Sequence, residues 1–129
     1  MPPPLPDEFN VVSEAVVDAA FAVHKTLGPG LLESVYETCL AHECSKKGLA
    51  VQRQVVVPIV YDGHRFDDGL RLDLLVEGKV VVELKAVDVL QAVHRAQVLT
   101  YLKLAHKRLG LLINFNVPRI KDGIQRIVL

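Results

Sequence analysis

The sequence contains no apolar run long enough to cross a membrane and only two cysteines. One of its longest apolar stretches, Val55 to Tyr61, falls far short of the roughly 18 residues that a bilayer requires, and Pro58 interrupts it. Cys39 and Cys44 are too few for a disulfide scaffold and lie in a segment with helical spacing, so we expect both to be reduced. No signal-peptide pattern is present. These absences predict a soluble, cytoplasmic protein with no membrane partner.

Net charge and the common nucleotide-binding motifs are also missing. Fifteen basic residues balance fifteen acidic ones, which argues against binding nucleic acid by bulk electrostatics. There is no glycine-rich phosphate loop, no dinucleotide fingerprint and no serine in a nucleophile-elbow pattern. The spacing of Cys39, His42 and Cys44 does not resemble a structural zinc knuckle. Because the net charge is zero, any basic surface must be local.

Hydrophobic periodicity predicts two helices followed by three strands. Apolar residues recur at three- and four-residue steps in 9–27 and again in 31–47, which is the spacing of amphipathic helices. Gly28-Pro29-Gly30 separates these two helices, because Pro29 cannot continue the hydrogen-bond ladder. β-branched residues then dominate three predicted strands, at 51–61, 70–76 and 80–87.

The second half of the chain adds one helix and two strands. Asp88 is a predicted helix cap, with Gln91 completing a capping-box pattern, and the helix is expected to run to about Lys107. The predicted strands are 109–115 and 124–129. The order is ααβββαββ, in a single domain at 9–129 that follows a flexible, proline-rich start at 1–8.

The two strands at 70–76 and 80–87 form a predicted hairpin that brings two carboxylates together. If Glu77-Gly78-Lys79 is the turn, one face of the hairpin is apolar. The predicted pairs on that face are Val76 with Val80, Leu74 with Val82, and Leu72 with Leu84. Because side chains alternate along a strand, the same register places Asp73 beside Glu83 on the opposite face, and Lys85 shares that face.

Two adjacent carboxylates repel each other unless a positive charge lies between them. Oxygen ligands suit Mg²⁺ or Mn²⁺, which take one or two carboxylates together with water and substrate phosphate. Lys85 could orient or deprotonate the attacking water, or neutralise charge that develops on the phosphate. The alternative interpretation is a solvent-facing sheet surface on which Arg71, Asp73, Glu83 and Lys85 form salt bridges.

Four further side chains are candidates for the same site. Glu33 lies in the first turn of the second helix, where it could reach a metal, although the helix dipole alone favours a carboxylate there. His94, Gln97 and Tyr101 follow one line on the later helix and could contact a nucleic-acid backbone. Tyr101 could equally be an aromatic residue at the edge of the core.

The sequence resembles the GxxExxY protein family, which is assigned to the PD-(D/E)XK nuclease superfamily. The naming motif stands here as Gly30, Glu33 and Tyr36, and the resemblance extends from about His24 to Leu129. The other matching segments are Asp73-Leu74-Leu75-Val76, Val82-Glu83-Leu84-Lys85-Ala86, His94 with Gln97 and Tyr101, and Gly110-Leu111-Leu112-Ile113-Asn114-Phe115.

The resemblance implies an α/β (α+β) fold with a restriction-endonuclease-like αβββαβ core, in which helices flank a mixed central sheet. It further implies that Asp73 and Glu83 bind the metal, that Glu33 completes the acidic set and that Lys85 assists the water. Gln97 with Tyr101 resembles the Gln-x-x-x-Tyr helix motif of recombination nucleases. Leu72 stands where the superfamily's eponymous proline would be.

These observations predict a Mg²⁺- or Mn²⁺-dependent nuclease that hydrolyses DNA, with RNA as the alternative polymer. A homodimer is expected because a duplex cut needs two sites and this chain supplies one. The main rival is a non-catalytic nucleic-acid- or protein-binding module that retains the fold. A hydrolase acting on a small phosphorylated substrate is a third possibility, and it would require a closed pocket.

Overall fold

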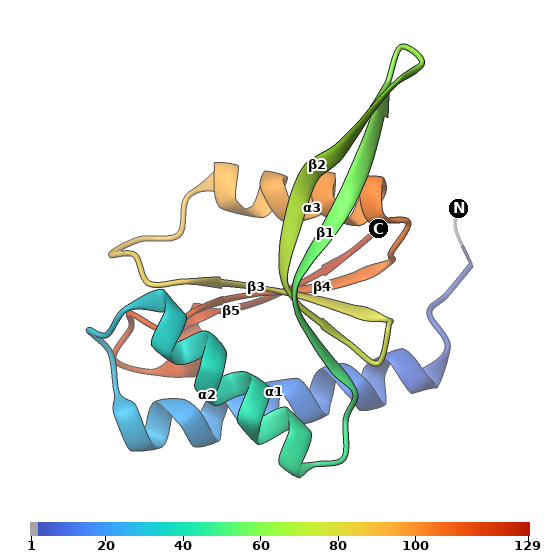
Figure 1. The fold of residues 1–129 in the computed structure, drawn as a ribbon. Helices are drawn as coiled ribbons and strands as arrows, with labels where there is room; N and C mark the ends of the chain where they lie inside the picture. Colours follow the sequence, from blue (N-terminus) through green and yellow to red (C-terminus); the bar gives the residue numbers. More distant parts are fainter. Residues whose placement is uncertain (1–2) are drawn as a thin grey trace.

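A five-stranded mixed sheet forms the centre of the structure, a computed structural model that describes residues 3–129 (Figure 1). The strands lie in the order β1 to β5; β3 and β4 run parallel, and all other neighbours are antiparallel. Their bounds are β1 Val51–Tyr61, β2 His64–Val76, β3 Val80–Lys85, β4 Leu109–Asn114 and β5 Ile124–Val128. The predicted element order is confirmed, with one additional short 3-10 helix, η1 (Ile120–Gly123).

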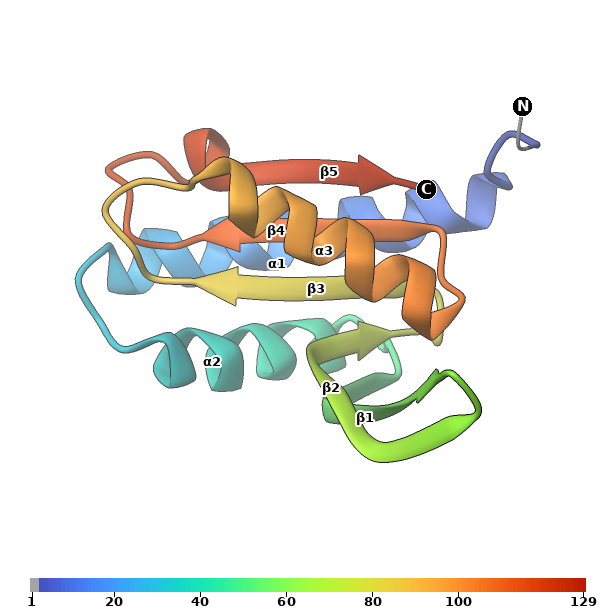
Figure 2. The same ribbon diagram turned by 90° about the horizontal axis from the view of Figure 1, so that it is seen from above.

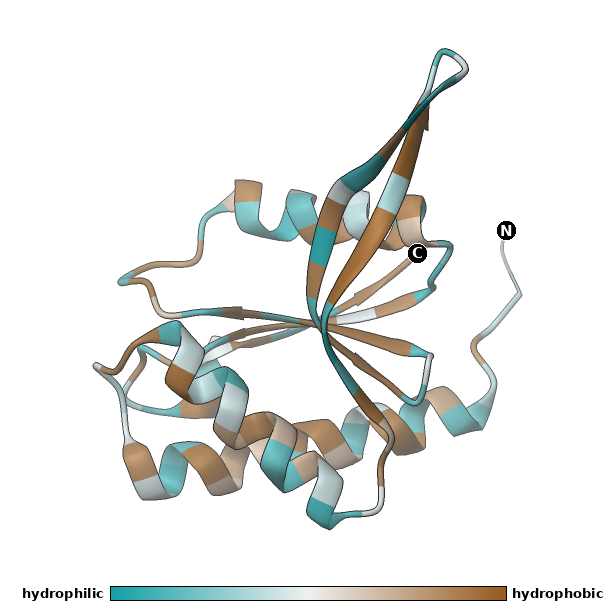
Figure 3. Ribbon diagram, in the orientation of Figure 1, coloured by the Kyte–Doolittle hydropathy of each residue, from teal (hydrophilic) through white to brown (hydrophobic). Residues whose placement is uncertain are grey.

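Helices cover both faces of this sheet. α1 (Asp7–Leu27) and α2 (Glu33–Lys46) lie on one face, and α3 (Ala92–Ala105) lies on the other (Figures 1 and 2). β3 and β4 are almost continuously hydrophobic, as expected for strands that are buried on both sides (Figure 3). Within residues 3–129, the structure contains no helix long and apolar enough to span a membrane.

The predicted register of the β2–β3 hairpin is confirmed near the turn and changes at Asp73. Val76 pairs with Val80 and Leu74 with Val82. Leu74 and Val76 pack in the core under α1 and α2, whereas Leu72 packs in the core under α3. Placing Leu72 on the same face as Leu74 was therefore wrong. Strict alternation thus fails between Leu72 and Leu74, where the neighbouring strand β1 carries Gln54 in the left-handed conformation.

The start of α3 also differs from the prediction. The helix begins at Ala92 with Gln91 as its N-cap, so the expected cap at Asp88 was wrong. The backbone N–H of Gln91 donates to Nδ1 of His94 at 2.9 Å, which completes the first turn. Glutamine is not among the side chains preferred at this position, so the sequence pattern favoured the aspartate three residues earlier.

The outer parts of β1 and β2 project beyond the sheet as a long hairpin (Figure 1). Asp62 and Gly63 form its turn with φ angles of 50° and 77°, the left-handed conformation that two-residue hairpin turns require. β2 begins at His64, six residues before its predicted start. The polar segment Arg65 to Asp68 has little strand-like alternation, because neither of its faces is buried.

Candidate active site

The carboxylates of Asp73 and Glu83 meet where β2 and β3 begin to separate. The Cα pairs between these strands end at Leu74 and Val82. Beyond that point, the backbone N–H of Asp73 donates to Oε1 of Glu83 at 3.1 Å, and the N–H of Leu84 donates to Oδ2 of Asp73 at 2.8 Å. Each carboxylate therefore accepts a hydrogen bond from the backbone of the neighbouring strand, which fixes the two acidic groups side by side.

Burial makes this pair electrostatically costly. Glu83 is only 4% exposed, and its burial, followed by the negative charge of Asp73, raises its pKa to about 8. The hydrogen bond from the Asp73 backbone and the charge of Lys85 lower the pKa, but by less. The effects that destabilise the ionised form of Glu83 thus outweigh those that stabilise it, and a bound cation would stabilise this form. A solvent-facing, salt-bridged surface does not describe this buried group.

Lys85 ends β3 and is half-buried two residues after Glu83. Its positive charge lowers the pKa of both Glu33 and Glu83, so the ammonium lies within electrostatic reach of both. It forms no ion pair with a carboxylate in the part of the chain that the structure describes. The ammonium group is consequently available to a substrate.

Glu33 is the first residue of α2, and its carboxylate lies within electrostatic reach of Asp73 and Lys85. Partial burial of its carboxylate raises its pKa, and the charge of Asp73 raises it further. Among residues 3–129, however, no three His, Cys, Asp or Glu side chains are close enough together to hold one metal ion. The structure thus brings Glu33 near Asp73 without completing a three-carboxylate cluster.

Tyr36 explains how the start of α2 is positioned. Its hydroxyl donates to the carbonyl of Gly28 at 2.6 Å and accepts a hydrogen bond from the N–H of Leu31 at 3.1 Å. Its buried ring stacks on Phe115, which follows β4, with ring centroids 4.6 Å apart. These contacts fasten the α1–α2 turn to the sheet, and they thereby place Glu33 at the site.

Two of the three predicted residues on α3 contact each other, and one of them lies within electrostatic reach of the carboxylates. Gln97 Nε2 donates to the hydroxyl oxygen of Tyr101 at 3.0 Å. Burial raises the pKa of Tyr101, and the charges of Glu83 and Asp73 raise it further, so this hydroxyl lies within electrostatic reach of the acidic pair. His94 lies half-buried in the first turn of α3, where its Nδ1 accepts the capping hydrogen bond. Only its Nε2 is therefore free for an outside partner.

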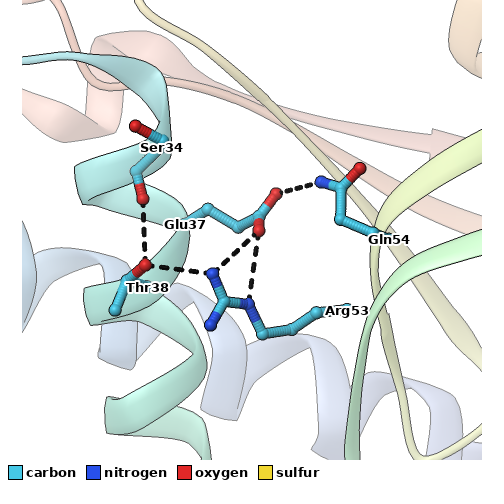
Figure 4. Close-up of polar contacts among 5 residues, drawn as sticks. All are labelled: Ser34, Glu37, Thr38, Arg53 and Gln54. Carbon is cyan, nitrogen blue, oxygen red and sulfur yellow. Dashed lines mark hydrogen bonds and ion pairs between the residues drawn. The ribbon is translucent and has the colours of Figure 1, made fainter.

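A polar network that sequence reasoning missed connects α2 to β1 (Figure 4). Glu37 is 8% exposed, and its Oε2 accepts hydrogen bonds from Nε and Nη2 of Arg53 at 3.2 and 3.0 Å. Its Oε1 accepts a hydrogen bond from Nε2 of Gln54 at 2.5 Å. Nη2 of Arg53 also donates to Thr38, which donates to the carbonyl of Ser34.

This network lies opposite Asp73. Gln54 has a φ of 51°, and it falls between the Cα pairs Arg53–Leu74 and Val55–Leu72. A non-glycine residue in this left-handed conformation is strained, and the hydrogen bond to Glu37 holds it there. Glu37 follows Glu33 by one helical turn, a spacing that marks a shared helix face, but no sequence pattern indicated its partners on β1.

A mixed sheet carrying two carboxylates on a central hairpin, followed by a lysine two residues later, defines a nuclease-like protein of the restriction-endonuclease fold. A family model described as the PD-(D/E)XK nuclease superfamily matches residues 10–127. The chain belongs to the PD-(D/E)XK nuclease superfamily. No curated protein and no solved structure matches the sequence. The narrower GxxExxY assignment rests on Gly30, Glu33 and Tyr36 and stays a prediction.

Proposed function

We propose that this protein is a metal-dependent nuclease that hydrolyses phosphodiester bonds in DNA, with RNA as the alternative polymer. The observation that carries the proposal is the buried pair of Asp73 and Glu83, in which burial and mutual repulsion disfavour the ionised form of Glu83. A divalent cation between these carboxylates would offset both effects. Membership of the nuclease superfamily supports the same chemistry.

The donor set fits Mg²⁺ or Mn²⁺. Both ions prefer oxygen ligands, and Mg²⁺ commonly uses one or two carboxylates while retaining water and binding substrate phosphate. Asp73 and Glu83 would hold the ion, and Glu33 would contribute through a water or after a small movement of its side chain. When bound, a divalent cation supplies Lewis-acid stabilisation of the charge that develops on the phosphate oxygens.

The remaining side chains have complementary tasks. The Lys85 ammonium is positioned to orient the attacking water or to neutralise charge on the transferred phosphoryl group. Gln97 and Tyr101 offer hydrogen-bond donors on α3, and His94 can offer Nε2–H. α2 and α3 both begin at the end of the sheet where β3 ends (Figures 1 and 2), and the partial positive charge at helix N-termini favours phosphate there.

The rival function is a non-catalytic nucleic-acid- or protein-binding module. A binding module has no need for a buried, mutually repelling carboxylate pair, and such a pair costs stability when no cation offsets it. The presence of Lys85 and Tyr101 within electrostatic reach of the pair likewise favours catalysis. The proposal also includes a cytoplasmic location and a homodimer, because cutting both strands of a duplex calls for two sites.

The test is calorimetric titration of Mn²⁺ and Mg²⁺ into the wild type, Asp73→Asn and Glu83→Gln, with Asp18→Asn on α1 as the matched control. Each protein is then incubated with plasmid, single-stranded DNA and RNA. We expect metal binding and cleavage in the wild type and the control, and neither in the two site variants. Absence of metal binding even with DNA present would support the binding module, and equal cleavage by all four proteins would identify a contaminant.

A further inference from the structure

The projecting hairpin, residues 56–70, carries apolar side chains that the rest of the chain leaves exposed. We call this segment the arm (Figure 1). Val60, Tyr61 and Phe66 near its tip are 66%, 73% and 53% exposed, and Val56 nearer the sheet is 42% exposed. Large apolar side chains gathered on one projection mark a contact surface rather than a solvated loop.

The tip of the arm is acidic. Asp62, Asp67 and Asp68 lie within seven positions, and all three are exposed. Arg65 is engaged locally, because its Nε pairs with Oδ1 of Asp67 at 2.7 Å. An excess of carboxylates at the tip opposes contact with nucleic-acid phosphates, and it favours a partner surface that is apolar and basic.

The chain itself has such a surface beside the same arm, where β1 faces α3. A groove of about 540 Å³ lies between β1 and the C-terminal end of α3. Its lining residues are Pro58, Ile59, Val60, Lys103, Leu104 and His106. Gly69 leaves room for the side chain of Ile59, which lines the groove, since a Cβ at position 69 would lie 2.3 Å from Cγ1 of Ile59. The groove is thus apolar between β1 and α3 and bordered by basic groups from the helix.

We propose that the arm is a dimerisation arm, whose apolar, acidic tip enters the groove between β1 and α3 of a second copy of this chain. The second copy places its own arm in the first groove. Two antiparallel arms related by a two-fold axis satisfy this arrangement, because each tip then lies between β1 and α3 of the other copy. Lys103 of each chain faces the acidic tip of its partner, so apolar burial and charge complementarity coincide.

The arms meet through their faces rather than by extending the sheet. β1 is an edge strand, and such edges invite pairing with another chain. Pro58 lies in the middle of its projecting half and has no N–H to donate, which interrupts a continuous ladder along this edge. The proposed interface contains neither Asp73 nor Glu83, so its test is independent of nuclease activity.

The first experiment measures mass in solution by sedimentation velocity over a range of protein concentrations. We expect the wild type to associate to twice the chain mass, and Tyr61→Ser combined with Phe66→Ser to stay at the chain mass. Thermal denaturation of both proteins checks that the variant is folded. A wild type that stays monomeric at every concentration, or a folded variant that still dimerises, would overturn the proposal.

A charge exchange tests the reciprocal geometry. One protein carries Lys103→Glu in the groove, and another carries Asp67→Lys with Asp68→Lys at the tip. Each alone brings like charges together and should be monomeric, whereas their mixture should form a heterodimer, because both of its contacts are again complementary. Lys25→Glu on α1 is the control and should dimerise as the wild type does.

Two results would contradict the proposed geometry. Failure of the mixture to associate, while the wild type dimerises, would place the interface elsewhere on the molecule. If the tip variants lose DNA affinity but sediment with the same mass as the wild type, the arm contacts nucleic acid instead of a second copy.

Discussion

Glu83 is the residue whose protonation most directly reports the proposed site. Its pKa in the folded protein is about 8, raised from 4.5 by burial and then by Asp73. The folded state therefore holds this proton more tightly than the unfolded state does. The stabilisation from this proton is complete below the unfolded value and is lost as pH rises from about 4.5 through about 8.

We accordingly predict that the metal-free protein loses stability as pH rises through this interval. One pKa unit corresponds to about 1.4 kcal/mol, so the loss amounts to a few kcal/mol. Glu83→Gln should flatten the dependence, and Mn²⁺ should raise the melting temperature more at the upper end of the interval than at the lower end. Melting curves followed by circular dichroism measure both effects, with Asp18→Asn as control. An unchanged slope in Glu83→Gln would contradict the assignment.

The Tyr36 hydroxyl is expected to affect the site indirectly, because its hydrogen bonds hold the α1–α2 turn that precedes Glu33. Tyr36→Phe keeps the stack on Phe115 but removes the hydrogen bonds to Gly28 and Leu31. Loss of two partly buried hydrogen bonds should lower the free energy of unfolding by about 1–3 kcal/mol, and it should slow cleavage because Glu33 is displaced. Urea denaturation and the cleavage rate measure these effects. Ser45→Ala, which removes an exposed hydroxyl on α2, is the control, and it should change neither.

At the scale of elements, the link between α2 and β1 is predicted to support metal binding without supplying a ligand. Glu37→Gln removes the charge that Arg53 pairs with and weakens the hold on Gln54, whose backbone is strained opposite Asp73. We expect weaker Mn²⁺ binding together with a loss of stability of about 1–3 kcal/mol. Calorimetric titration gives the affinity, measured at a temperature where the variant is fully folded.

A matched substitution in the same network separates the metal effect from simple destabilisation. Thr38→Val removes the contact of Arg53 with the threonine hydroxyl and that hydroxyl's hydrogen bond to Ser34. It keeps the bonds of Glu37 to Arg53 and Gln54, so it should leave Mn²⁺ affinity unchanged. Equal affinities for Glu37→Gln and the wild type would mean that the network stabilises the fold alone.

Local patterns predicted the elements and the meeting of Asp73 with Glu83, but they did not predict contacts made between elements. The hairpin register follows from alternation and a three-residue turn, which are properties of neighbouring residues. Glu37 and Arg53 are sixteen positions apart and meet only because α2 lies against β1. Leu72 was misplaced for a related reason, since the break in alternation lies beside Gln54 on another strand, whose left-handed backbone no pattern within β2 indicates.

At the scale of the whole molecule, the proposed site has two parts, one on the sheet and one on α3. Asp73, Glu83 and Lys85 belong to the sheet, whereas Gln97 and Tyr101 belong to α3, which packs on one face. Gly110 in β4 sets how closely this helix approaches, because a Cβ there would lie 2.9 Å from Cγ1 of Val98. Valine is short and branched, so it cannot bend away, and an added methyl group must push the helix outward.

Gly110→Ala should therefore separate nucleic-acid binding from metal binding. We expect a loss of about 1–3 kcal/mol in stability and weaker binding of DNA, because α3 carries Gln97 and Tyr101 away from the carboxylates. Mn²⁺ affinity should stay near that of the wild type, since the pair on β2 and β3 is untouched. The double variant Gly110→Ala with Val98→Ala removes the obstructing methyl groups and should recover DNA binding. Failure of the second substitution to restore binding, in a folded protein, would show that the position of α3 does not govern contact with the substrate.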